Sequence, residues 1–478
     1  RMNTTATLVW FRRDLRLADN PALCEAAESG EVLPLFILDD AEPIGAASRW
    51  WLHQSLACLD RTLGGGLRRL RGNPEQQLLQ LLQQTGIRRV NWNRVWEPAA
   101  LAQDARIQTR LEQQGIEVRV FDSSLLWRPD QVLKSDGSPY RVFTPYYRKG
   151  CLQQEPPRFP LAEPEQIRLQ QGINLSLSLE ALQLLPKIHW EDGLARRWQP
   201  GEFGARAHLA HFIAKRLSAY QTQRDRPDRD GTSGLSPHLH FGEISPNQIW
   251  HLVQQHGAER GLSENHDCFL SELAWREFSA YLLYHWPTLP QRNFRPEFDR
   301  FAWQVDNPAL KRWQRGLTGV PLVDAGMREL WKTGFMHNRV RMVVASYLVK
   351  NLLQDWRMGA AWFADTLVDA DLASNSASWQ WVAGSGADAA PYFRIFNPVT
   401  QGQKFDPDGI YIRRYCPELG RLPSRWIHAP WQAPAEVLSQ AGIRLGEHYP
   451  HPQVDLGASR QRALTAYAAL KESADAPV

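Results

Sequence analysis

The pattern that most constrains the fold is an alternation of strand-like and helix-like segments over the first 121 residues. Strands are predicted over 6–10, 32–38, 67–70, 88–95 and 116–121, of which the first two are largely apolar runs typical of buried strands. Segments with helical periodicity lie between them, over 22–28, 50–63, 75–84 and 101–114. Such alternation is typical of a parallel sheet with helices on both faces. Residues 1–130 are therefore predicted to form an α/β domain with a Rossmann-like parallel sheet.

The alternation gives way to a connector and then to a purely helical pattern. Prolines punctuate the connector, which we place at residues 131–203. Beyond it, apolar residues recur at helical spacing over 207–220, 269–284, 321–332, 338–353 and 360–368. A chain of 478 residues is also too long for one hydrophobic core. The third predicted region, residues 204–478, is an all-α domain.

Composition and missing motifs exclude several classes of function. The net charge is only +4, so a nucleic-acid surface would need locally clustered arginines. The cysteines form no CxxC pair and no apolar run reaches membrane-spanning length, which predicts a soluble cytoplasmic protein. No GxGxxG, P-loop, HExxH or nucleophile-elbow motif is present, so dinucleotide, metal and hydrolytic sites of standard type are unsupported. The 20 tryptophans exceed ordinary packing needs and point to stacking or electron transfer.

One helical stripe has an unusual composition. Asp371, Asn375 and Trp379 recur at intervals of four and would share a helix face, with Trp381 off that face. An acid, an amide and a large aromatic make a plausible wall for a redox cofactor. A capped, partly exposed helix with two structural tryptophans explains the same residues.

Other segments also allow a chemical and a structural interpretation. The segment Gly231-Thr-Ser-Gly-Leu-Ser236 could hold a phosphate through backbone N–H groups and hydroxyls, or be a polar loop with a helix cap. Residues 269–276 place Phe269, Glu272 and Arg276 on one face beside Trp275, either as a pocket wall or as a surface ion pair.

The segment 334–342 and three separate tryptophans complete the candidates. Asn338, Arg339, Arg341 and Met342 could contact a base, a phosphate or Asp369, or form an ordinary helix surface. Trp303, Trp356 and Trp379 could carry an electron to a buried cofactor, or pack in the core.

Taken together, these segments resemble the photolyase/cryptochrome family, and most of all bacterial cyclobutane pyrimidine dimer photolyases. The motifs that carry the resemblance are Val9-Trp-Phe-Arg-Arg-Asp-Leu-Arg16, Gly231-Thr-Ser-Gly-Leu-Ser-Pro237, Glu272-Leu-Ala-Trp-Arg-Glu277, Met336-His-Asn-Arg-Val-Arg-Met342, Asp369-Ala-Asp-Leu-Ala-Ser-Asn375, Trp379-Gln-Trp381 and Ala390-Pro-Tyr-Phe-Arg-Ile-Phe-Asn-Pro398. The likeness covers nearly the whole chain and is strongest over residues 205–430.

The resemblance implies a site for flavin adenine dinucleotide (FAD), active in its reduced anionic form. The implied FAD residues are Tyr220, Thr232, Ser233, Leu235, Ser236, Phe269, Glu272, Arg276, Asn338, Arg341, Asp369, Asp371 and Asn375. Asn375 would face flavin N5, and Arg341 would pair with Asp369. Phe269 and Phe335 depart from the family, which often has tryptophan at these positions.

The resemblance also implies a substrate, UV-damaged DNA, and a relay for light-driven flavin reduction. A flipped-out dimer would pack against Trp275 and Trp381, and extrusion of such a poorly stacked pair costs only a few kcal/mol. The remaining substrate contacts would come from Glu272, Asn338, Met342, Arg339 and Arg394. The relay, from the flavin outward, would be Trp379, Trp356 and Trp303. The expected reaction is electron transfer from reduced FAD to the dimer, catalysed by a monomer.

Some alternatives remain open within the resemblance. A cryptochrome receptor is disfavoured by Asn375, Trp275 and Trp381, a (6-4) photolyase by the lone His337, and a single-strand-specific enzyme by Trp381. A light-independent flavin oxidoreductase is a remote alternative. An antenna chromophore, folate or deazaflavin, is expected in the N-terminal domain, with Arg49 and Asp104 as candidate contacts, and a flavin antenna or no antenna also stays open. The segments that bind folate in the best-known relatives are not matched.

Overall fold

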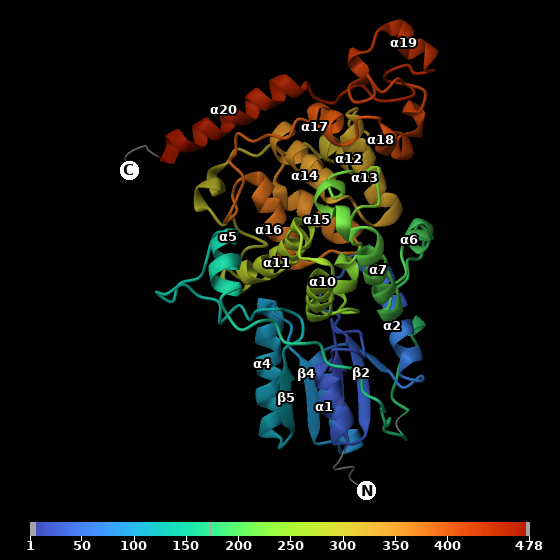
Figure 1. Ribbon diagram of the computed structural model, residues 1–478, viewed down its shortest axis with the longest axis vertical. Coiled ribbons are helices and arrows are strands. Elements are labelled where there is room, and N and C mark those ends of the chain that lie inside the picture. The colour runs from blue at the N-terminus through green and yellow to red at the C-terminus, as the bar shows by residue number, and fades with distance from the viewer. Residues whose placement is uncertain (1–5, 173, 475–478) are drawn as a thin grey trace. The chain divides into compact units, whose positions relative to one another are not determined.

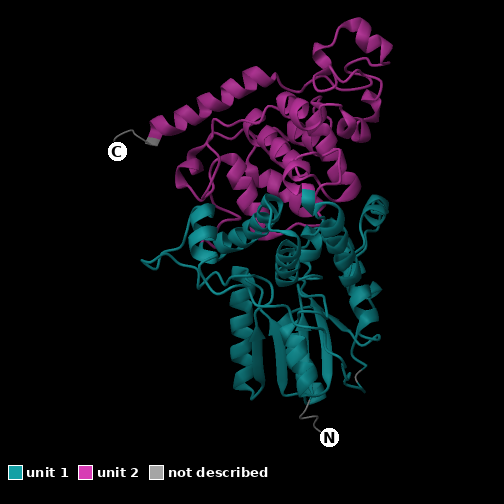
Figure 2. Ribbon diagram, in the orientation of Figure 1, with its two compact units in different colours: residues 1–218, 233–285 teal, residues 219–232, 286–478 magenta. Residues whose placement is uncertain are grey.

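The computed structural model describes residues 6–172 and 174–474. The chain divides into two compact units, coloured separately in Figure 2. Unit 1 comprises residues 1–218 and 233–285, and unit 2 comprises residues 219–232 and 286–478. The predicted fold class, an α/β N-terminal domain followed by an all-α domain, is confirmed, whereas the predicted limits at residues 130 and 204 stay a prediction.

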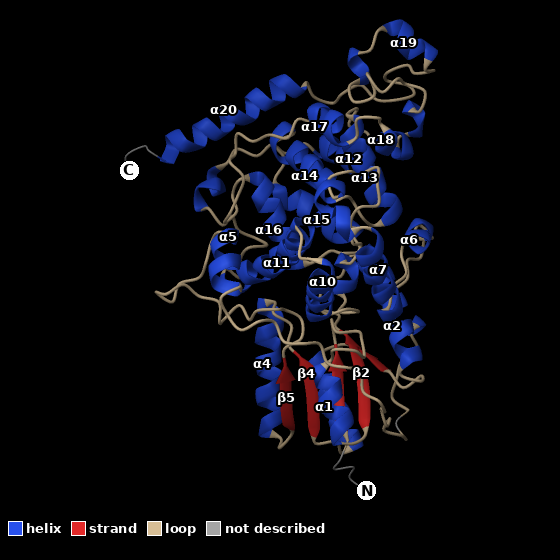
Figure 3. Cartoon of the chain, in the orientation of Figure 1, coloured by secondary structure: helices blue, strands red, loops and turns tan. Residues whose placement is uncertain are grey.

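A five-stranded parallel sheet forms the centre of unit 1, with strand order β3-β2-β1-β4-β5. Its strands, red in Figure 3, are β1 Thr7–Phe11, β2 Val32–Leu38, β3 Arg68–Arg71, β4 Arg89–Asn93 and β5 Glu117–Phe121. The register pairs Leu8 with Leu33 on one side and with Val90 on the other. Every residue of β1 and β2 is buried, as expected for central strands covered on both faces.

Helices cover this sheet, and Figure 1 shows α1 lying along it and α4 beside β5. Asn20 and Asn73 cap α1 and α3, each followed by a proline at the first helical position, which is a strong start signal. The helical elements assigned mainly to unit 1 are α1 Pro21–Ser29, α2 Ala46–Thr62, α3 Pro74–Thr85, α4 Pro98–Gln113, α5 Phe143–Pro145, η1 Tyr146–Cys151, η2 Glu180–Leu182, α6 Asp192–Arg197, α7 Glu202–Lys215, η3 Leu217–Ala219, α9 Ser236–His240, α10 Pro246–Arg260 and α11 Glu264–His285.

The regular elements of unit 2 are all helical among its described residues. Its elements are α8 Tyr220–Gln223, η4 Pro296–Arg300, α12 Asn307–Arg315, α13 Pro321–Thr333, α14 Asn338–Ser346, η5 Tyr347–Asn351, α15 Trp356–Thr366, α16 Leu372–Ala383, α17 Pro398–Phe405, α18 Ile410–Tyr415, η6 Pro417–Leu419, η7 Pro430–Gln432, α19 Ala435–Gln440 and α20 Leu456–Ala474. One large apolar cluster draws on α12 to α16 and α18 and includes Trp313, Trp356 and Trp379.

The predicted elements agree with the structure in type, and three differences matter. The helix predicted over 207–220 is α7, which ends at Lys215. The helix predicted over 338–353 ends at Ser346 and continues as the π-helical turn η5, because periodicity alone does not mark the extra residue of such a turn. Helix α20 was not predicted. No helix among the described residues is both long and apolar enough to span a membrane.

Candidate functional site

Asp371 is the N-cap of α16 and not a residue of the helix. Its Oδ2 accepts a hydrogen bond from Ser374 N at 2.9 Å, and the helix begins at Leu372. The predicted stripe is therefore wrong at its first position, because a capping residue has extended backbone. Asn375 and Trp379 do lie one turn apart within α16.

The side-chain amide of Asn375 is fixed by helix α15. Its Nδ2 donates to the carbonyl of Ala360 at 2.9 Å. Because a carbonyl accepts only, the nitrogen must face Ala360. The amide oxygen, an acceptor, is thus directed away from this contact.

Arg341 and Asp369 form the ion pair that was predicted from the sequence. The pair is bidentate, with Nη1–Oδ1 at 3.2 Å and Nη2–Oδ2 at 2.9 Å. Arg341 Nε also donates to Met336 O at 2.6 Å, and the guanidinium lies 4.8 Å from the centre of the Phe335 ring. The side chain of Asp369 is 6% exposed, so two opposite charges are fixed together in a largely buried place.

The start of α14 carries the other predicted residues of this segment. His337 is the N-cap and accepts from Arg339 N through Nδ1 at 3.2 Å, and burial lowers the pKa of His337 to about 4. Arg339 Nη2 lies 3.1 Å from Asp225 Oδ1 and its guanidinium 4.5 Å from the Phe405 ring centre. Arg339 therefore has a carboxylate partner already. Met342 packs against the core cluster of unit 2, and Asn338 is the first residue of α14.

Within unit 1, α11 holds Phe269, Glu272, Trp275 and Arg276. Trp275 stacks on Phe143 with ring centres 3.9 Å apart and planes at 12°, so one face of the indole is covered. Phe269 contacts Phe212 at 4.6 Å between ring centres. Phe143 lies 132 residues earlier in the chain, and no sequence signal links it to Trp275.

Arg276 is anchored to the loop that follows the sheet. Its Nη1 donates to Ser124 O and lies 3.1 Å from Glu277 Oε2. Glu277 Oε1 accepts from Leu126 N at 2.6 Å, and burial raises the pKa of Glu277 to about 7. Within unit 1 these contacts direct Arg276 toward the 124–127 segment.

The predicted phosphate loop is divided between the two units, with residues 231–232 in unit 2 and residues 233–236 in unit 1. In unit 2, Tyr220 is buried in α8 and Arg224 lies over its ring, and a Cβ at Gly231 would be 2.6 Å from Gln223 O. In unit 1, Ser233 Oγ accepts from Leu235 N at 3.3 Å, and Ser236 starts α9. Thr232 belongs to unit 2.

The three tryptophans of the predicted relay belong to or pack against the core cluster of unit 2. Trp356 and Trp379 are 0% and 2% exposed, and Trp303 is partly buried. Trp379 lies 4.9 Å from Phe363 and 6.1 Å from Trp313 between ring centres. Trp356 Nε1 donates to Asn293 Oδ1 at 2.9 Å. Trp313 was not predicted as a neighbour of this relay. Only the structure places it beside Trp379, because the two residues lie on different helices.

Trp381 and Arg394, the last predicted substrate residues, also belong to unit 2. Trp381 is partly buried against the core cluster. Arg394 is exposed, and its backbone N–H donates to Pro391 O at 2.9 Å within a tight loop.

The candidate antenna residues have separate partners in unit 1. Asp104 is 7% exposed and lies 2.6 Å from Arg12 Nη1, and burial raises the pKa of Asp104. Arg49 Nη2 donates to Gln183 O at 2.5 Å.

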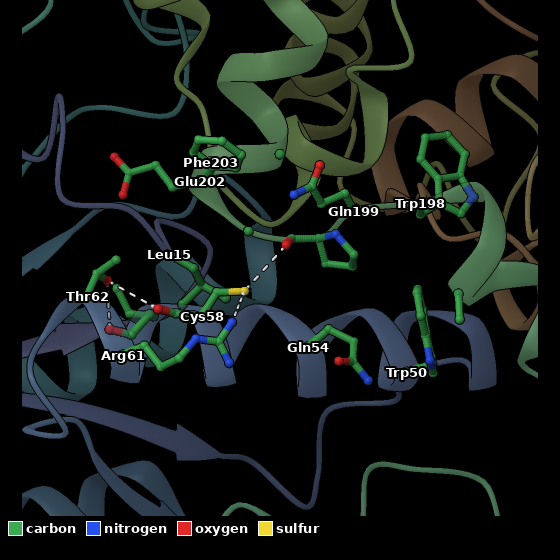
Figure 4. A pocket seen from close by; sticks show the side chains of 15 residues that line it. Leu15, Trp50, Gln54, Cys58, Arg61, Thr62, Trp198, Gln199, Glu202 and Phe203 are labelled. Carbon is green, nitrogen blue, oxygen red and sulfur yellow. Dashed lines mark hydrogen bonds between the residues drawn. The ribbon is translucent and has the colours of Figure 1, made fainter.

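A pocket of about 510 Å³ opens between α2 and residues 195–204 of unit 1. Figure 4 shows Trp50, Trp198 and Phe203 among the residues that line it, with Cys58 beside Leu15 and Arg61. Cys58 Sγ accepts from Arg61 Nη2 at 3.2 Å and donates to Pro200 O at 3.4 Å. Burial raises the pKa of the Cys58 thiol, which favours the neutral form. No cluster of three or more His, Cys, Asp or Glu that could hold a metal occurs in the described part of the chain.

Comparison with known proteins identifies the family. The model described as "FAD binding domain of DNA photolyase" matches residues 269–469, and the model described as "DNA photolyase" matches residues 7–165. The chain belongs to the photolyase/cryptochrome family and groups with enzymes named deoxyribodipyrimidine photo-lyase.

Relatives named photo-lyase and relatives named cryptochrome both match most of the chain. A deoxyribodipyrimidine photo-lyase of Agrobacterium fabrum is 47% identical over 99% of both chains. Cryptochrome-1 of Arabidopsis thaliana is 40% identical over 95% of this chain and 69% of its own length.

Solved structures of photolyases are also similar to this chain. A class III photolyase from Agrobacterium tumefaciens superposes with a TM-score of 0.96 at 47% identity, covering 99% of both chains. An archaeal photolyase from Sulfolobus tokodaii "with two FAD molecules" superposes with a TM-score of 0.81 at 29% identity, covering 97% of this chain and 100% of that one.

Proposed function

We propose that this chain repairs cyclobutane pyrimidine dimers in DNA under blue light, as a carbon–carbon lyase. When bound, reduced FAD supplies one electron to the dimer and receives it back after two carbon–carbon bonds have broken, so there is no net redox change. Relatives of both functional kinds match the chain, so family membership alone does not decide between repair and signalling. The observation that carries the proposal is the orientation of Asn375.

The residues present fit reduced FAD. Because Asn375 Nδ2 is committed to Ala360 O, the oxygen remains to face a ligand. This oxygen is an acceptor, and the N5–H of a reduced flavin is a donor. The amide also brings no negative charge, which would disfavour an anionic flavin. Asn375 therefore suits the state of the cofactor that repair requires.

The other FAD contacts follow from the family resemblance. The Arg341–Asp369 pair would lie beside the flavin ring, where it adds polarity without net charge. The remaining residues that would hold FAD are Tyr220, Thr232, Ser233, Leu235, Ser236, Phe269, Glu272, Arg276, Asn338 and Asp371.

A flipped-out dimer would be held by aromatic and polar side chains. Trp275 and Trp381 would form its apolar walls, and the stacking of Trp275 on Phe143 supports this role because it fixes the indole in advance. Glu272 would bind the pyrimidine edge, with Asn338 and Met342 lining the pocket. Arg339 and Arg394 would bind flanking phosphates. Of these two, Arg394 has the exposed side chain, whereas Arg339 must share its charge with Asp225.

Trp379, Trp356 and Trp303 would carry electrons inward when oxidised flavin is photoreduced. The burial of Trp356 and Trp379 in one apolar cluster, with Trp303 packed against it, supports this use, since it excludes water from the two inner side chains.

The decisive experiment uses a duplex oligonucleotide with one thymine dimer and pre-reduced enzyme. We expect light-dependent return of the intact-thymine absorbance and none in darkness. Absence of repair, with flavin that can still be photoreduced, would favour a cryptochrome or a (6-4) photolyase. Fast bleaching of the flavin by NADPH in darkness would favour an oxidoreductase.

A second, light-harvesting chromophore of the folate or deazaflavin class is proposed for unit 1. Asp104 and Arg49 are the contacts implied by the resemblance, and the aromatic pocket of Figure 4 offers another place for a planar ring system. Absorbance of the denatured supernatant would identify the chromophore. Loss of the chromophore in Asp104→Asn but not in Trp50→Ala would favour Asp104, and the reverse would favour the pocket.

We further propose that the enzyme acts as a cytoplasmic monomer that associates with the nucleoid by binding DNA. Sedimentation of the purified protein tests the first part. A concentration-independent mass near 54.7 kDa is expected, and a stable dimer would contradict it.

A further inference from the structure

Lys350 is a buried amine that the proposed reaction does not use. It lies in η5, is 1% exposed and forms no ion pair with a carboxylate among the described residues. An unpaired buried cation is costly, and an apolar side chain of equal length would serve packing better. Burial lowers the pKa of Lys350 to about 7, which shows how poorly its surroundings solvate the charge.

The amine of Lys350 is directed at one backbone atom. Its Nζ donates to the carbonyl of Arg394 at 3.0 Å and lies 5.0 Å from the ring centre of Tyr392. One helical turn earlier, Ser346 Oγ accepts from Phe396 N at 3.2 Å. Two buried side chains of one segment therefore bind the 390–397 loop on both sides of Arg394.

The loop itself is divided into buried and exposed residues. Tyr392 and Phe396 are 3% and 8% exposed, and Tyr392 stacks on Tyr467 with ring centres 4.4 Å apart. The side chains between them, Phe393 and Arg394, are exposed. Anchoring of the carbonyl of Arg394 thus sets the direction in which its side chain leaves the surface.

The backbone that carries Lys350 is irregular. The π-helical turn η5 follows α14, and Leu353 shortly after it has a left-handed φ of 51°. Conformations of this kind cost free energy and persist where the surroundings enforce them. The turn directs Lys350 toward the loop.

We propose that Lys350 is a positioning residue of the DNA-binding surface: by holding the Arg394 carbonyl it fixes the 390–397 loop so that Arg394 reaches a backbone phosphate. This inference rests on the proposed function, in which Arg394 contacts DNA. Because Lys350 acts through Arg394, loss of either residue removes the same interaction.

The test is a double-mutant cycle on the holoenzyme with a duplex containing one thymine dimer. Lys350→Met keeps an unbranched apolar side chain as far as Cε and removes the amino group, and with it the donor and the charge. We expect it to raise Kd about tenfold in the wild-type background and less than twofold in Arg394→Ala. Turnover at saturating DNA, FAD content and flavin photoreduction should stay at wild-type values. Lys311→Met, which removes one exposed charge from α12, should change Kd less than twofold.

The proposal would be overturned if the losses of DNA affinity caused by Lys350→Met and Arg394→Ala were additive. It would also be overturned if Lys350→Met lowered turnover as much as affinity. If Lys350→Met does not fold, the cycle is repeated with Ser346→Ala, which removes the hydrogen bond to Phe396 N. Kd and turnover are measured and interpreted in the same way. Failure of the wild-type enzyme to repair under light would instead refute the proposed function, so the two failures are distinguishable.

Discussion

Gly359 in α15 leaves the space that Trp379 occupies, and its substitution tests both packing and electron transfer. A Cβ added at Gly359 would lie 2.2 Å from Cη2 of Trp379, and 2.5 and 2.6 Å from two further ring carbons. Carbon atoms in contact prefer about 3.5–4.0 Å, so the indole or the helix would have to move by more than about 1 Å. Trp379 is 2% exposed and enclosed by Phe363 and Trp313, which leaves the ring little room.

The expected free-energy change for Gly359→Ala combines two opposing effects. Overpacking of this severity costs about 3 kcal/mol, at the upper end of its usual range. Alanine in place of glycine inside a helix recovers about 1 kcal/mol. The net loss of about 2 kcal/mol corresponds to a Tm lower by roughly 4–8 °C for a unit of this size. The displaced indole should also change the rate of flavin photoreduction, whereas repair by pre-reduced enzyme should persist.

Calorimetry and photoreduction kinetics on the same preparations provide the assay. Gly457→Ala in α20 is the matched control, because its Cβ would meet only an ordinary contact, 3.4 Å from Asp455 Oδ1. This control should not lower Tm. If Gly359→Ala leaves both Tm and photoreduction at wild-type values, the tight packing of Trp379 against α15 is refuted.

Four further substitutions have defined outcomes. Trp379→Phe should abolish photoreduction of oxidised flavin and leave repair by pre-reduced enzyme largely intact; loss of both would exclude a relay role. Glu272→Ala should lower dimer affinity and repair yield with FAD retained, and no effect on either would make Glu272 structural. Arg394→Ala should reduce the salt slope of DNA binding by about one, so an unchanged slope removes it from the phosphate surface. Tyr449→Phe removes the 2.6 Å hydrogen bond to buried Asp324 Oδ2, and urea unfolding should show a loss of about 1–3 kcal/mol; a smaller loss would mean that the bond is replaced.

Much of the fold could be predicted because local pattern and tertiary environment agree. The run Val32–Leu38 is apolar throughout, and it is buried throughout as β2. The start of α16 shows the opposite situation. Aspartate is one of the residues preferred at an N-cap, but helical spacing drew Asp371 into the stripe with Asn375.

The partners of the candidate residues could not be read from the sequence. Trp275 meets Phe143, and Arg339 meets Asp225, each more than 100 residues away. Lys350 shows the limit most clearly. Within an apolar helical run a lysine predicts an exposed face. Lys350 lies in the π-helical turn, where the side chains no longer follow the α-helical spacing. Its side chain is therefore directed to the interior and is buried.

These partners decide which cations remain available to DNA. Arg341 is neutralised by Asp369 and Arg339 by Asp225, whereas Arg276 is only partly neutralised by Glu277, because a pKa of about 7 leaves that carboxyl partly protonated near neutral pH. Arg394 is exposed and forms no ion pair among the described residues. Its backbone carbonyl accepts a hydrogen bond from the amine of Lys350. Since each neutralised phosphate contributes about 0.9 to the salt slope of duplex binding, a site with few unpaired arginines should show a shallow slope. Recognition would then depend on the aromatic walls and on the low cost of extruding a damaged pair. This balance fits a chain whose net charge is only +4.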